Sequence, residues 1–225
     1  YVEERELTVM LAVDASASEN FGSVQRFKRE LAAELTAVLS FAATTNNDRV
    51  GLLIFTDQVE LYIPPRKGRK HVLRLLRELL AFQPQHRGTD IKLALDTVNH
   101  ILKRRSIIFL VSDFMAHPDS YRTAMAVTNR RHDLIAVELH DPLEQALGNV
   151  GLLAIEDPES GEIVWVDTGS KAWRVAFQQR MDSRRAGATR AFRQAGVDRI
   201  DVATNQDYVA ALTAFFQERY RRIRH

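Results

Sequence analysis

The stretch LTVMLAVDASAS, residues 7–18, decides the fold because it joins a mostly apolar run to a polar turn. A short apolar run of this kind is typical of a strand buried on both faces in a parallel sheet. The turn offers only oxygen atoms, from Asp14, Ser16 and Ser18. Alternate residues leaving a strand can point into one small space, and an all-oxygen set favours Mg²⁺ or Mn²⁺ over zinc or copper. A strand that ends in Asp and Ser also commonly caps the next helix, so this turn alone leaves both interpretations open.

Two later segments repeat this polar chemistry at the ends of other predicted elements. RGTD, residues 87–90, lies in a polar loop before a helical pattern, and Ser112-Asp113 closes a second apolar strand. Thr89 or Asp90 could be a helix N-cap, and Asp113 could cap the helix that follows it. Taken together with the first turn, the three segments in this order resemble the metal-ion-dependent adhesion site of von Willebrand factor A domains, and this resemblance implies one metal site.

The amino-acid composition limits the kinds of protein and of functional site that this chain can form. The chain has 225 residues, 45% of them hydrophobic, which is enough for one sizeable core, and we expect a single domain over residues 1–225. It contains no Cys, which excludes disulfides, thiolate zinc sites and cysteine nucleophiles and fits a reducing compartment. No apolar stretch approaches the roughly 20 residues of a membrane helix. Because the chain begins with Tyr1, we expect a fragment whose N-terminal region is missing, and a membrane anchor there stays open.

Hydrophobic periodicity alternates between strand and helix along most of the chain. Strands are predicted at 7–13, 50–55, 59–63, 106–112, 134–139 and 199–202, helices at 23–44, 72–80, 91–102, 119–130, 173–195 and 207–222, and a hairpin at 152–166 that turns at 158–161. Short connections between alternating elements imply parallel pairing and right-handed crossovers. The fold class predicted is therefore α/β, with a doubly wound, mainly parallel sheet flanked by helices, one antiparallel edge strand and the added hairpin.

The prediction of a metal site depends on the predicted order of the strands in the sheet. In a doubly wound sheet the ligand crevice lies outside the carboxyl ends of the strands, where the strand order reverses. If the order is 3-2-1-4-5-6, the first and fourth strands are neighbours at that reversal. Asp14 and Asp113 would then converge, although they are far apart in the sequence.

Seven segments carry a resemblance to a known family: ERELTVML (4–11), FG (21–22), DRVGL (48–52), YIPP (62–65), GTD (88–90), SDF (112–114) and DPLE (141–144). They are similar to the bacterial von Willebrand factor A-like family catalogued as domain of unknown function fifty-eight, over nearly the whole chain. The resemblance implies a metal-ion-dependent adhesion site with the ligands Asp14, Ser16, Ser18, Thr89 and Asp113. It also implies a non-enzymatic, cytoplasmic partner or adaptor of a MoxR-type AAA+ ATPase, in chaperone-like or metal-centre maturation work.

The chemistry of the predicted site favours binding over catalysis. Two carboxylates and three hydroxyls leave one position of an octahedral Mg²⁺ for water or for an Asp or Glu of a protein partner. Hydrolysis would need a positioned base or a second metal. Asp141 and Glu144 could supply that base if they reach the crevice, but we expect them to shape a loop. Two alternatives remain open: an extracellular adhesion domain with the same site, and a metal-dependent hydrolase.

Three further features could bear on the site or its partners. Glu19 adds negative charge where many family members carry Met, and His86 could lie behind the metal ligands as a pH-sensitive group. Of the 31 Lys and Arg residues, twelve lie from residue 171 onwards, against five of the 29 Asp and Glu. This basic end suggests a docking face, but a solvated helix face is the interpretation that we favour. The basic run 66–71 lacks interleaved aromatic residues, so we expect no nucleic-acid partner.

Overall fold

A six-stranded sheet forms the middle layer of the molecule in the computed structural model, which describes residues 6–224 except 21, 24–25, 146 and 157–161. In spatial order its strands are β10 (Asp198–Ala203), β7 (Asp133–His140), β6 (Ile107–Ser112), β1 (Thr8–Asp14), β4 (Arg49–Phe55) and β5 (Val59–Arg66). All neighbours are parallel except β4 and β5, which are antiparallel. The strand order and the antiparallel edge strand are those predicted from the sequence.

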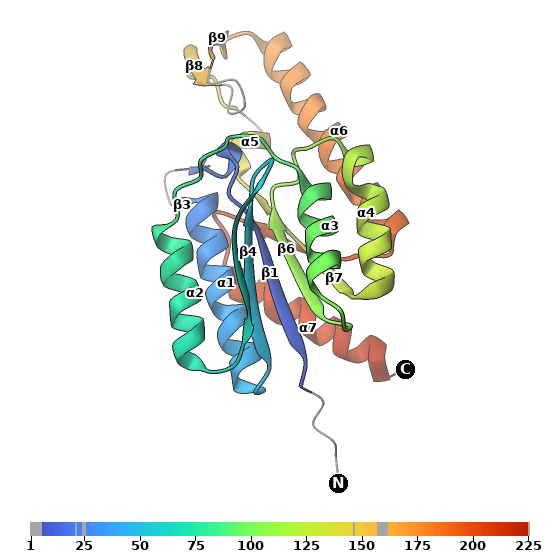
Figure 1. The fold of residues 1–225 in the computed structure, drawn as a ribbon. Helices are drawn as coiled ribbons and strands as arrows, with labels where there is room; N and C mark the ends of the chain where they lie inside the picture. The colour runs from blue at the N-terminus through green and yellow to red at the C-terminus, as the bar shows by residue number, and fades with distance from the viewer. Residues whose placement is uncertain (1–5, 21, 24–25, 146, 157–161, 225) are drawn as a thin grey trace.

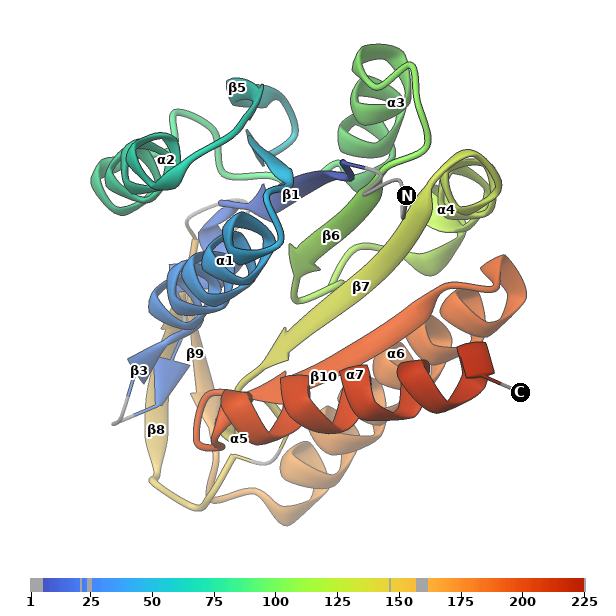
Figure 2. The same cartoon turned by 90° about the horizontal axis from the view of Figure 1, so that it is seen from below.

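Helices cover both faces of the sheet (Figure 2). α1 (Lys28–Thr45), α2 (Arg69–Ala81) and α7 (Tyr208–Arg224) pack on one face, and α3 (Ile91–Ile101), α4 (Pro118–Arg131) and α6 (Lys171–Ala195) pack on the other. β1 shows why two helical layers are needed. Its alternate side chains enter opposite cores, with Leu11 in the first and Met10 in the second, and both are fully buried.

The region before α1 differs from the prediction. The predicted helix began at residue 23 and placed Phe27 on its buried face, but the helix begins at Lys28 and Phe27 is 50% exposed. Two short strands, β2 (Gly22–Ser23) and β3 (Arg26–Phe27), precede it. Phe27 has extended backbone and acts as the N-cap residue, and the Glu30 carboxylate accepts a hydrogen bond from the Phe27 amide at 3.1 Å. This cap ends the extended segment and starts the helix.

The edge strand β5 also differs from the prediction. Pro64 and Pro65 do not end the strand but lie inside it, because β5 continues to Arg66. Proline is compatible with an edge strand, whose outer N–H groups need no partner. Gly51 on β4 makes room for the ring of Pro65, since a Cβ at Gly51 would lie 2.9 Å from Pro65 Cγ. Two short helices were not predicted: the 3₁₀ helix η1 (Ala17–Asn20) and α5 (Pro142–Gln145).

The predicted hairpin is present as β8 (Leu152–Glu156) and β9 (Ile163–Asp167), which pair antiparallel. Its predicted turn at 158–161 falls outside the described residues. The hairpin and the first turns of α6 extend beyond the end of the sheet at which α5 lies (Figure 1). Among the described residues, no helix is long and apolar enough to cross a membrane.

Candidate metal centre

The carboxyl ends of β1 and β6 bring two acidic residues together. Asp14 is the last residue of β1, and Asp113 directly follows Ser112, the last residue of β6. The two strands are parallel neighbours, with Val13 aligned with Val111. Because the strand order reverses between these strands, the crossovers diverge and leave their carboxyl ends uncovered by a connection. Both carboxylates are nevertheless buried, with 2% and 6% of each residue exposed.

Local hydrogen bonds fix the Asp14 carboxylate. Its Oδ1 accepts from the Ser16 amide at 2.9 Å, and its Oδ2 accepts from the Ser112 hydroxyl at 2.7 Å. The Ser16 and Ser18 hydroxyls lie 3.1 Å apart. The turn after β1 therefore folds back over the strand end and brings three of the predicted ligands together.

The turn after β6 positions Asp113. Its Oδ1 accepts from the Met115 amide at 3.1 Å, and its carboxylate also accepts from the Ser18 hydroxyl. Phe114 adopts a left-handed backbone with a φ of 52°, which is costly for a non-glycine residue. Its ring packs edge-on against Phe192 of α6, at a centroid distance of 4.9 Å. Packing of this aromatic side chain thus holds the strained turn that directs Asp113 into the site.

Glu19 is the acidic residue whose role the sequence indicated least clearly. It is 1% exposed, and its Oε1 accepts from the Asp113 amide at 3.0 Å. Its Oε2 is buried and has no hydrogen-bond partner among the described residues. One carboxylate oxygen each from Asp14, Glu19 and Asp113 lie within 4.8 Å of one another. The added negative charge expected beside the site is therefore part of the cluster itself.

Thr89, the remaining predicted ligand, lies half-buried in the loop before α3. The backbone of this loop contacts the β1 turn, since the Arg87 carbonyl accepts from the Ala17 amide at 3.0 Å. Among the described residues, no hydrogen bond joins the Thr89 side chain to the other four predicted ligands. The structure thus brings Asp14, Ser16, Ser18 and Asp113 together and places the loop of Thr89 beside them.

A buried lysine that sequence analysis missed completes the cluster. The Lys28 ammonium lies 2.7 Å from Asp113 Oδ2 and 2.7 Å from Glu144 Oε1, and its side chain is fully buried. Lys28 stands three residues before the buried Leu31 and seven before the buried Leu35, on the inward face of α1. That helical spacing was the available signal, because a charged residue in phase with a core face must find a buried partner.

The two acidic residues of the DPLE segment have different contacts. Asp141 accepts from the Leu143 amide at 2.8 Å and from the Thr204 hydroxyl at 2.5 Å, so it shapes the turn as expected. Glu144 also caps this turn, but it reaches the crevice and pairs with Lys28. The His86 ring contacts Glu60, whose carboxylate lies 3.1 Å from His86 Nδ1.

The electrostatics of the cluster show an unbalanced negative charge. Burial and the nearby charge of Asp113 raise the pKa of Asp14 to about 7, and the same two causes raise the pKa of Glu19. Burial alone would raise the pKa of Asp113, but the Lys28 ammonium outweighs it and lowers that pKa. Burial opposes the positive charge of Lys28 and on its own would lower the pKa of that lysine. The surrounding carboxylates outweigh burial and raise the pKa above its usual value.

The donor set fits a hard divalent cation. The carboxylates of Asp14, Glu19 and Asp113 lie together, the Lys28 ammonium pairs with Asp113 and Glu144, and the nearby serines add neutral oxygens. Small divalent ions with a preference for oxygen ligands, such as Mg²⁺ and Mn²⁺, suit this set, whereas zinc prefers nitrogen and sulfur. The unpartnered Glu19 oxygen is the observation that most directly calls for a cation.

Comparison with known sequences shows which protein family the chain belongs to. Residues 1–187 match the family described as "Protein of unknown function DUF58". The chain belongs to this family. It is 30% identical over 222 residues to the uncharacterized protein Rv1480 of Mycobacterium tuberculosis, covering 98% of this chain and 69% of that protein. It is also 26% identical over 161 residues to the uncharacterized protein MAV169 of Mycobacterium avium.

Solved structures support the fold of this DUF58 chain. An aerotolerance-related membrane protein from Bacteroides fragilis superposes with a TM-score of 0.67 at 18% identity, covering 94% of this chain and 98% of that one. BatB from Bacteroides thetaiotaomicron superposes with a TM-score of 0.63 at 14% identity, covering 97% of this chain and 100% of that one. The DUF58 chain thus shares its fold over nearly its whole length with these two proteins, and its topology is the doubly wound, mainly parallel sheet predicted from the sequence.

Proposed function

We propose that this DUF58 domain is a Mg²⁺- or Mn²⁺-dependent protein-interaction module. The metal would be held by Asp14, Ser16, Ser18, Thr89 and Asp113, and a partner would place an Asp or Glu on it. The observation that carries this proposal is the buried acidic cluster at the switch point, in which one Glu19 oxygen has no partner among the described residues. When bound, the metal would supply a positive centre that attracts a carboxylate.

The roles of the chain's own residues follow from their contacts. Ser112 and the Ser16 amide orient Asp14, and the Met115 amide orients Asp113. Lys28 keeps Asp113 ionised. It also neutralises part of the negative charge that would remain on the carboxylates after a divalent ion has bound. Five predicted ligands leave one octahedral position. Glu19 and a partner's carboxylate are the two groups that would compete for it.

We further propose a binding role without catalysis. Two contacts support this: Glu144 pairs with Lys28, and Asp141 accepts from Thr204, so both carboxylates are already engaged. Neither stands ready as the base that metal-assisted hydrolysis needs. As partner we propose a MoxR-type AAA+ ATPase or its client in the cytoplasm, and this part rests on the family resemblance alone.

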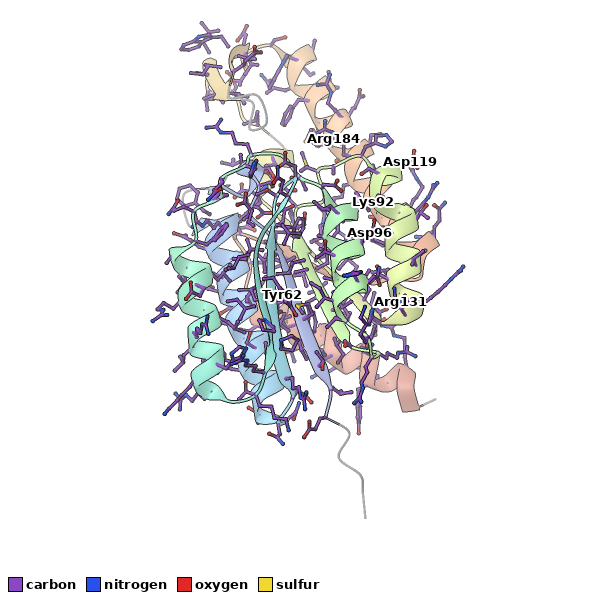
Figure 3. The ribbon with its side chains drawn as sticks, in the orientation of Figure 1. Tyr62, Lys92, Asp96, Asp119, Arg131 and Arg184 are labelled. Carbon is purple, nitrogen blue, oxygen red and sulfur yellow. The ribbon has the colours of Figure 1, made fainter. Side chains whose placement is uncertain are left out.

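The test is binding of the purified full-length protein to the MoxR-type ATPase of the same organism, measured by biolayer interferometry with Mg²⁺ and with chelator. Asp14→Ala should abolish metal-dependent binding, and Thr89→Ala should weaken it at least tenfold, because truncating a central charged contact commonly costs about 2 kcal/mol or more. Asp96→Ala, an exposed acidic residue of α3 far from the cluster, is the control (Figure 3). Wild-type binding that chelator leaves unchanged, or equal binding by wild type and Asp14→Ala with Mg²⁺ present, would refute the metal-dependent mechanism.

A further inference from the structure

A groove of about 500 Å³ separates the N-terminal half of α4 from the middle of α6. It exists because the two helices approach closely at one point and diverge from there. A Cβ added to Gly187 of α6 would lie 3.1 Å from Pro118 Cγ of α4. Arg180, Arg184, Ala191 and Gln194 line the groove, at the three- and four-residue spacings that put side chains on one helix face.

Positive charge dominates this groove. Four arginines line it: Arg122, Arg180, Arg184 and Arg190. All four are exposed, and Arg122 pairs with Asp119, the single acidic residue of the lining, at 3.2 Å. The other three make no ion pair within the part of the chain that the structure describes. Three unpaired guanidinium groups around one concavity form a site that is built for carboxylates, which arginine binds with two parallel hydrogen bonds.

The groove continues toward the acidic cluster. Arg184 also lines a smaller neighbouring pocket, whose other walls include Asp113 and Glu144. Figure 3 shows Arg184, in the middle of α6, near Asp119 at the N-terminal end of α4, while Arg131 lies at the opposite end of α4. A chain segment lying in the groove would therefore lead from the arginines to the predicted metal centre.

We propose that this arginine groove, defined by Arg122, Arg180, Arg184 and Arg190, binds an acidic segment of a partner protein. It is a site separate from the metal, and it deepens the function proposed above by giving the partner's chemistry: several Asp or Glu residues in sequence. Charge complementarity carries the assignment. A nucleic acid fits less well, because no Phe, Tyr or Trp lines the groove to offer bases a broad stacking surface.

The experiment measures fluorescence anisotropy of a fluorescein-labelled decaglutamate peptide on the full-length protein. The groove variant is Arg180→Gln/Arg184→Gln/Arg190→Gln. The control variant is Arg69→Gln/Arg105→Gln/Arg131→Gln, which removes the same charge from exposed positions outside the groove. We expect the groove variant to bind the peptide at least tenfold more weakly than wild type and the control variant to bind within twofold of it. Circular dichroism checks that both variants fold.

Two further measurements distinguish peptide binding in the arginine groove from binding at the metal centre and from nucleic-acid binding. With chelator present, and in Asp14→Ala, the arginine groove should still bind the peptide, because its arginines need no metal. Loss of binding in those samples, or equal weakening by the groove and control variants, would overturn the proposal. Tighter binding of a labelled ten-base DNA strand than of the peptide would also overturn it in favour of a nucleic-acid surface.

Discussion

The Lys28 ammonium and the Asp113 carboxylate lie 2.7 Å apart in the interior, although 85 residues separate them in the chain. Lys28 is the first residue of α1, and Asp113 directly follows the last residue of β6. Their contact ties the first helix to the switch point of the sheet. It also gives the acidic cluster a fixed internal cation.

Lys28→Met should destabilise the protein strongly. The substitution leaves Asp113 and Glu144 buried without their counter-ion, and removing one partner of a buried pair typically costs about 3 to 5 kcal/mol. Urea unfolding gives the free energy of unfolding. Lys92→Met, which removes an exposed pair with Asp96, is the control and should leave the free energy of unfolding nearly unchanged. A Lys28→Met protein as stable as the control would show that the pair contributes nothing.

Mg²⁺ should recover part of the stability that Lys28→Met loses. A bound divalent ion would supply positive charge to the same carboxylates, and a ligand that binds only the folded state stabilises it. The measurement is the unfolding midpoint of wild type and Lys28→Met with and without Mg²⁺. An equal Mg²⁺ effect, or none, in the two proteins would mean that the ion and the lysine do not share the cluster.

Glu19→Gln should weaken metal binding by about tenfold, if the free Oε2 is a ligand, because the variant replaces a carboxylate by a neutral amide. The amide oxygen can still accept from the Asp113 amide, so the fold should be retained. The metal-free variant should be at least as stable as wild type, because the neutral amide replaces a carboxyl whose ionisation is opposed by burial and by the charge of Asp113. Isothermal titration calorimetry with Mg²⁺ and thermal unfolding give the two values. Unchanged affinity would limit Glu19 to holding the Asp113 backbone.

Asp201 should contribute to the acid sensitivity of the fold. Burial raises its pKa, but the hydrogen bond from His140 and the charges of Arg199 and Arg185 outweigh burial and lower the pKa to about 2. A lowered carboxyl pKa adds stability above the unfolded value near 4, and that stability is lost as pH falls from about 4 to about 2. Because the side chain is 39% exposed, solvent screening limits the contribution to less than about 1 kcal/mol.

The check for Asp201 is urea unfolding between pH 5 and pH 2. Asp201→Asn should be less stable than wild type at pH 5 and should lose less stability on acidification. Glu218→Gln, an exposed acid on α7, is the control. Parallel pH profiles for wild type and Asp201→Asn would contradict the lowered pKa.

Local patterns predicted the sheet well because its strands are short apolar runs with helices between them. The position of Asp14 and Asp113 followed from strand order, which the connection rules restrict to a few possibilities. Lys28 and Glu19 could not be assigned in the same way. Their roles depend on contacts across 85 and 94 residues, and such side-chain pairings leave no local pattern.

The start of α1 and the course of β5 show the same limit on a smaller scale. Phe27 matches the apolar phase of the helix, yet the Glu30 cap decides where the helix begins. Pro64 and Pro65 usually mark a strand end, yet an edge position tolerates them because β4 is the only neighbour. In both cases the competing interaction became visible only in three dimensions.

The two prolines of β5 have a consequence for how copies of this domain behave in solution. An outermost strand with free N–H groups can recruit a strand from another molecule and start sheet extension or aggregation. Pro64 and Pro65 have no N–H to offer, so β5 is a poor template for such growth. Strand addition along β5 is therefore interrupted at Pro64 and Pro65, and we expect a partner that binds there to recognise side chains rather than to add a strand.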